Sequence, residues 1–80
     1  MNNIALENLL KETQQKIAKF IDNDKVTVHV TNYLFEVKSG PFTMFSYSIK
    51  EGNVVEGMPH KVGFTPGRLI DLVASLKAVS

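Results

Sequence analysis

Two segments with helical hydrophobic spacing enclose a central stretch in which the spacing drops to two, and this order limits the possible folds more than any single residue. In the first segment, apolar residues recur every three or four positions, at Leu6, Leu9, Leu10, Ile17, Phe20 and Ile21. In the last segment, the same spacing joins Leu69, Leu72, Val73, Leu76 and Val79. Each helix would therefore carry one apolar face. The pattern predicts an α+β fold in the order α-β-β-β-α, with both helices on one face of a mainly antiparallel sheet of three to four strands.

The length of the chain bounds its organisation. Eighty residues are too few to close two hydrophobic cores, so we expect residues 1–80 to form a single small domain. Hydrophobic residues make up 44% of the chain and charged residues 21%, which is typical of a soluble globular protein. The absence of cysteine excludes thiolate metal sites and favours a reducing, cytoplasmic location. No apolar run approaches the roughly 20 residues that span a bilayer, so no membrane role is expected.

Capping residues predict where the two helices begin. The first helix is expected to start at Asn2 or Asn3, whose side chain can accept a hydrogen bond from an amide in the first turn, and to end near Ile21. The last helix is expected to start at Thr65 and Pro66, because threonine caps helices and proline suits the first helical turn.

The apolar positions change parity inside the first strand region. They are even from Val26 to Val30 and odd from Tyr33 onward. A strand cannot change the face that it buries without a turn or a bulge. Because no glycine is present at residues 31–32, we interpret the change as a bulge in one long strand, with a tight hairpin as the alternative.

Glycine and proline divide the remaining sheet region. Gly40 and Pro41 predict a chain reversal before a strand at residues 42–50. A short strand is expected at Val54 and Val55, and an edge strand at residues 61–64. The core is expected to include one set of residues from the helices and this sheet, namely Leu9, Ile17, Phe45, Tyr47, Leu72 and Leu76.

A candidate binding surface follows from the alternation of the strands. If the odd positions from Tyr33 to Ile49 pack under the helices, then Leu34, Phe42 and Met44 point to the opposite face of the sheet. Apolar side chains flanked by charge on an exposed face are typical of a contact with a protein partner or a second copy of the chain. Scattered exposed apolar residues are the alternative explanation.

A second candidate site surrounds the start of the last helix. Backbone amides and the helix dipole favour an anion at such a position. The residues that would contribute are His60, Lys61, Thr65, Gly67 and Arg68. Helix capping alone also explains this stretch.

Catalytic and metal-binding patterns are not evident. His29 and His60 are the only histidines, and their spacing to carboxylates does not indicate a metal site. No serine stands in the context of a nucleophile, and the small core leaves little room for a closed pocket. We therefore expect no enzyme activity, no metal and no cofactor.

The order of elements resembles that of the double-stranded RNA-binding domain. Gly40 and Pro41, between two predicted strands, resemble the loop of that family. The family's lysine-rich start of the last helix is replaced here by Thr65, Pro66, Gly67 and Arg68. The resemblance implies RNA binding through phosphate contacts, which those missing lysines would supply.

The net charge of +1, spread along the chain, provides no strong field for collecting nucleic acid. The leading hypothesis is a small non-enzymatic interaction module, a regulator or inhibitor of the compact kind that phages and mobile elements encode, acting on a partner protein or as a homodimer. The alternative is a domain that binds nucleic acid or a phosphorylated ligand.

Overall fold

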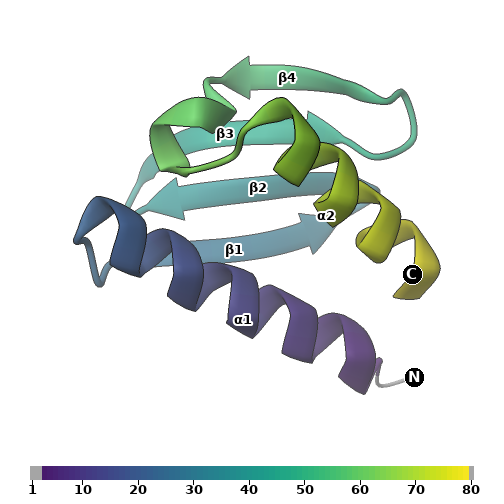
Figure 1. The fold of residues 1–80 in the computed structure, drawn as a ribbon, viewed down its shortest axis with the longest axis horizontal. Helices are drawn as coiled ribbons and strands as arrows, with labels where there is room; N and C mark the ends of the chain where they lie inside the picture. Colours follow the sequence, from purple (N-terminus) through teal and green to yellow (C-terminus); the bar gives the residue numbers. More distant parts are fainter. Residues whose placement is uncertain (1–2, 80) are drawn as a thin grey trace.

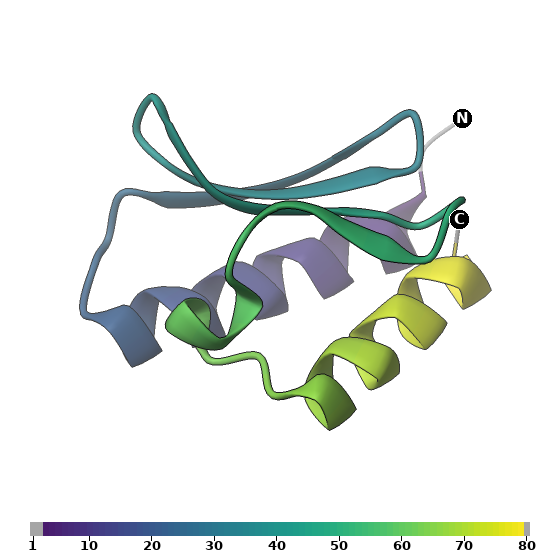
Figure 2. The same ribbon diagram turned by 90° about the horizontal axis from the view of Figure 1, so that it is seen from above.

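Two helices and a four-stranded antiparallel sheet make up the computed structural model, which describes residues 3–79 (Figure 1). The elements are α1 (Ile4–Ile21), β1 (Val26–Thr31), β2 (Leu34–Ser39), β3 (Phe42–Ser48), β4 (Asn53–Gly57), a short 3-10 helix η1 (Pro59–Val62) and α2 (Pro66–Val79). Each strand pairs with its sequence neighbour, in the order β1-β2-β3-β4. Figure 2 shows both helices on the same side of the sheet. The predicted α+β architecture is confirmed, with the order α-β-β-β-β-α.

Both long helices begin at the predicted side-chain caps. Asn3 Oδ1 accepts a hydrogen bond from the backbone N–H three residues later, at 3.0 Å. The other predicted cap, Asn2, lies outside the described residues. Thr65 Oγ1 accepts the corresponding bond at the start of α2, at 3.2 Å, and Pro66 is the first residue of that helix. Within residues 3–79, neither helix combines the length and hydropathy that spanning a bilayer requires.

A two-residue hairpin turn at Asn32 and Tyr33 separates β1 from β2, so the prediction of one long bulged strand is wrong. Thr31 pairs with Leu34 directly across the turn. Both turn residues have positive φ, 52° and 62°, as in a type I′ turn, whose twist matches that of the flanking strands. Asparagine adopts this conformation readily, whereas tyrosine is strained in it. The extra strand also departs from the three-stranded order on which the resemblance to the RNA-binding family rests.

A bulge is present in β3, at Met44. Val37 of β2 pairs with Phe45, whereas the following residue of β2 pairs with Thr43, so Met44 has no partner in this ladder. Because of the extra residue, the side chains on one side of the bulge point to the opposite face of the sheet from the one that strict alternation predicts. The strict alternation predicted for this strand is therefore interrupted, and Phe42 lies on the face opposite to the predicted one.

The segment after β4 forms η1 instead of the edge strand predicted for residues 61–64. Pro59 occupies the first position of η1, and Gly63, with φ of 93°, ends it. The backbone N–H of Phe64 donates to the carbonyl oxygen of Pro59 at 3.0 Å. This turn directs Phe64 toward the core, against which its side chain packs.

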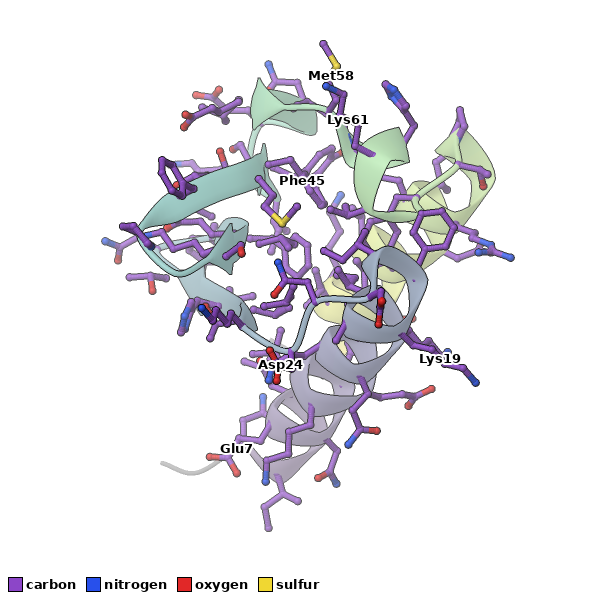
Figure 3. All side chains as sticks on the ribbon, turned by 90° about the vertical axis from the view of Figure 1, so that its left-hand side faces the viewer. Glu7, Lys19, Asp24, Phe45, Met58 and Lys61 are labelled. Carbon is purple, nitrogen blue, oxygen red and sulfur yellow. The ribbon has the colours of Figure 1, made fainter. Side chains whose placement is uncertain are left out.

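Phe45 of β3 lies at the centre of the core between the sheet and the helices (Figure 3). Its side chain is fully buried, and its ring centroid lies 5.7 Å from that of Phe35 and 5.6 Å from that of Phe64. Four of the predicted core residues are buried, namely Ile17, Phe45, Leu72 and Leu76. The other two, Leu9 and Tyr47, are half-buried and pack against this cluster.

Replacing Gly57 with alanine tests the close approach of β4 to β3. Gly57 has φ of 79°, and a Cβ there would lie 2.7 Å from Phe45 Cα. We expect Gly57→Ala to lower the free energy of unfolding by more than about 2 kcal/mol, because backbone strain and a backbone clash add together. Gly40→Ala is the control, since Gly40 has φ of 57° but meets no atom within 4 Å. Urea denaturation should show a loss of about 1 kcal/mol for the control, and equal losses would contradict the geometry.

Replacing Tyr33 with glycine tests the strained turn. Tyr33 is 59% exposed, so its ring contributes little to the core. Relief of the left-handed conformation, worth about 1–2 kcal/mol, should exceed the entropic cost of glycine, about 0.5–1 kcal/mol. We expect Tyr33→Gly to raise the melting temperature, whereas Tyr33→Ala, which keeps the strain, should not. A lower melting temperature for the glycine variant would show that the tyrosine ring stabilises the turn.

Candidate binding groove between the two helices

The outer face of the sheet, predicted to be the binding surface, is largely polar. Residues that pair across antiparallel strands share a face. The ladder therefore turns three rows of side chains away from the helices: Thr27, Lys38 and Thr43; His29, Glu36, Ser46 and Glu56; and Thr31, Leu34, Ser48 and Asn53. Leu34 is the one apolar side chain in these rows, and it is half-buried. This face therefore lacks the expected apolar cluster.

The bulge in β3 moves the other two predicted binding residues off this face. Phe42 pairs with Ser39, whose partner on β1, Val26, is buried in the core. Phe42 therefore belongs to the inner face, although it is 75% exposed at the end of its strand. Met44 is half-buried and packs against the core. The prediction that Leu34, Phe42 and Met44 all lie exposed on the outer face is wrong, because one extra residue reversed the alternation.

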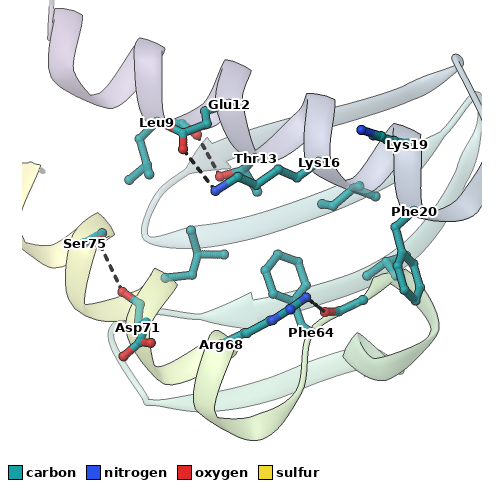
Figure 4. A pocket seen from close by; sticks show the side chains of 14 residues that line it. Leu9, Glu12, Thr13, Lys16, Lys19, Phe20, Phe64, Arg68, Asp71 and Ser75 are labelled. Atoms are coloured by element: carbon teal, nitrogen blue, oxygen red, sulfur yellow. Dashed lines mark hydrogen bonds and ion pairs between the residues drawn. The ribbon is translucent and has the colours of Figure 1, made fainter.

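A groove of about 780 Å³ lies between α1 and α2 and opens away from the sheet (Figure 4). Its floor is mostly apolar and consists of Leu9, Thr13, Ile17, Val62, Phe64 and Leu72. The hydroxyl of Thr13 donates to the carbonyl oxygen of Leu9 at 2.7 Å, so it is satisfied within α1. The walls are exposed side chains, namely Glu12, Lys16, Lys19 and Phe20 of α1 and Arg68, Asp71 and Ser75 of α2.

The groove exists because the two helices diverge. At one end, the side-chain amide of Asn3 donates to the carbonyl oxygen of Val79, which joins the start of α1 to the end of α2. Figures 1 and 2 both show the helices separating from that end. At the wide end, the ring of Phe20 lies over Gly63, where a Cβ would be 3.1 Å from the ring. Phe20 is nevertheless 61% exposed, so apolar surface reaches solvent between polar walls.

Within the described residues, some charged side chains of the groove form an ion pair and others do not. On α1, Lys16 pairs with Glu12 at 3.0 Å, and both side chains are exposed. Lys19 of α1 and Arg68 of α2 have no carboxylate within 4.0 Å in the described part of the chain. Arg68 Nη1 donates to the carbonyl oxygen of Gly63, five residues earlier, at 3.5 Å. The wide end therefore carries two unpaired positive charges on opposite walls.

The five residues of the predicted anion site at the start of α2 do not share one surface. Thr65 accepts the backbone N–H of Arg68, which is the capping role. Gly67 is exposed in the first turn of α2. His60 and Lys61 are exposed residues of η1 that do not line the groove, whereas Arg68 does. The structure therefore brings one of these five residues into the groove.

Sequence reasoning missed the groove because its shape depends on the angle between two helices that are far apart in the chain. Phe20 was the available signal. It continues the apolar spacing of α1 into its last turn, next to Lys19, but is 61% exposed, whereas Ile21 in the same turn packs against the core. An aromatic side chain at the exposed end of an apolar stripe is a common feature of contact surfaces.

Two serine substitutions test which residues of β3 contact the core. Met44→Ser should lower the free energy of unfolding by about 1–3 kcal/mol, because it removes contacts with the core. Phe42→Ser should change this free energy by less than about 0.5 kcal/mol, because Phe42 is exposed. Urea denaturation of both variants distinguishes the two positions, and equal losses would contradict the bulge at Met44.

No protein-family model, no curated protein and no solved structure matches this chain significantly. Within residues 3–79, no three side chains of histidine, aspartate, glutamate or cysteine gather closely enough to hold a metal ion.

Proposed function

We propose that this protein is a non-enzymatic interaction module whose groove between α1 and α2 holds a helical segment of a partner protein. The observation that carries the proposal is an apolar floor that is open to solvent between two exposed polar walls. Exposed apolar surface with a polar rim is the usual composition of a protein contact.

The shape of the groove favours a helix as the occupant. Both walls are helices, and a third helix can lay its apolar face between them as in other helix-in-groove complexes. On α1 the lining residues extend from Leu9 to Phe20. At 1.5 Å per residue this stretch is about 16 Å long, which matches roughly three turns of a bound helix.

Binding accounts for the groove better than catalysis does. Its charged wall residues are solvent-exposed, as shown by the 76% and 64% exposure of the Lys16 and Glu12 side chains. An open, wet groove does not exclude water from a reacting group. A regulator or inhibitor needs only a surface of this kind, and the absence of cysteine suits action in the cytoplasm.

A selection from a displayed library of 16-residue helix-forming peptides, with the purified protein as bait, tests this proposal. Selected peptides should perturb the backbone NMR signals of groove residues such as Lys16 and Ser75, and leave those of Thr27 and His29 on the outer sheet face unchanged. Signals that move on the outer face and not in the groove would refute the site.

A pair of tryptophan variants on α2 supplies the matched control. Ser75 lines the groove and Ala74 does not, although both are exposed neighbours on the same helix. Ser75→Trp should fill the narrow end of the groove and weaken peptide binding at least tenfold, whereas Ala74→Trp should change it less than threefold. Equal effects of the two variants would contradict binding in the groove.

A further inference from the structure

We infer that the groove selects a helix carrying acidic side chains at the end that lies between Lys19 and Arg68. This inference rests on the proposed function and names the chemistry of the partner. It follows from the uneven distribution of charge along the groove and from the apolar surface beside that charge.

The two cations approach the wide end from opposite walls. Lys19 is in the last turn of α1, and Arg68 is in the first turn of α2. Figure 4 shows the Arg68 side chain reaching toward Phe64, whereas the carboxylate of Asp71 points away from it. Arg68 Nη1 donates to the carbonyl oxygen of Gly63 at 3.5 Å. A carboxylate placed here would face two positive charges without first breaking an ion pair within the described chain.

The acidic residues that follow α1 do not contribute to this end of the groove. The acidic residues that follow α1 are Asp22 and Asp24, and neither lines the groove. Figure 3 shows Asp24 and Lys19 on opposite sides of the end of α1. The start of α2 adds the positive end of its helix dipole to the same region. Because Glu12 is paired with Lys16, the remaining charges that line the groove are Lys19 and Arg68 against the single carboxylate of Asp71, so this end has a net positive charge.

The groove as a whole does not suit a nucleic acid. A phosphate backbone carries regularly spaced charge and needs a continuous positive track. Here the walls also carry Glu12 and Asp71, and the floor between them is apolar. An amphipathic helix with acids at one end matches both the apolar floor and the local positive charge, so an acidic helix fits better than a polyanion.

The exposed ring of Phe20 gives the wide end a second recognition feature. It lies over Gly63, next to Lys19, and is 61% exposed. An apolar side chain of the partner, one helical turn from the acidic residue, could pack on this ring. Packing there would also shield the charge contacts from water, which strengthens them.

The test compares peptide selections on the wild type and on the charge-reversed variant Lys19→Glu/Arg68→Glu. Peptides selected on the wild type should contain aspartate or glutamate at one end, and their binding should weaken at least tenfold when those acids are replaced by lysine. The charge-reversed variant should lose these peptides at least tenfold and select basic residues at the same end.

A control variant with the same net charge separates local contacts from overall charge. Lys11→Glu/Lys61→Glu changes two lysines that do not line the groove, so it should change binding of the wild-type peptides less than threefold. Groove binding without any acidic preference would overturn the inference and leave the proposed function intact. If no selected peptide perturbs the groove, both fail. A 12-nucleotide RNA that displaces the peptides and loses affinity with Lys19→Glu/Arg68→Glu would indicate a polyanion and would overturn the inference.

Discussion

The contact of Phe45 with Phe35 and Phe64 is the interaction on which the rest of this structure depends. Phe35 and Phe45 belong to adjacent strands, whereas Phe64 belongs to the segment between η1 and α2. The three rings therefore anchor the start of α2 to the middle of the sheet. Because aromatic side chains bury large areas and pack in defined geometries, this anchor sets where α2 begins.

The course of α1 is determined separately, at the β1 edge of the sheet. Gln14 Oε1 accepts a hydrogen bond from the backbone N–H of Val28 in the edge strand β1, at 3.2 Å. One helix is thus held at the β1 edge and the other starts from the β4 side, while Asn3 and Val79 join their far ends. The helices must diverge, and the groove is the consequence of these separate anchors.

The same arrangement explains why we propose the groove, and not the outer face of the sheet, as the binding surface. Both faces of a sheet are available in principle, but the outer face here presents rows of polar side chains. Part of the apolar surface that the chain leaves accessible lies at the wide end of the groove, where Phe20 is 61% exposed. An acidic helix proposed for this position would complete the core and meet Lys19 and Arg68 at its end.

The sequence by itself determined the two helices, their caps at Asn3 and Thr65 and the sheet on one side of them, because hydrophobic period and capping are local properties. It did not determine the turn at Asn32 and Tyr33 or the bulge at Met44. Strand register depends on pairing partners far along the chain, and one extra residue reverses a face. Only the tertiary structure decided that the outer face is polar and that a groove opens between the helices, because the angle between α1 and α2 is set by their separate anchors on the sheet.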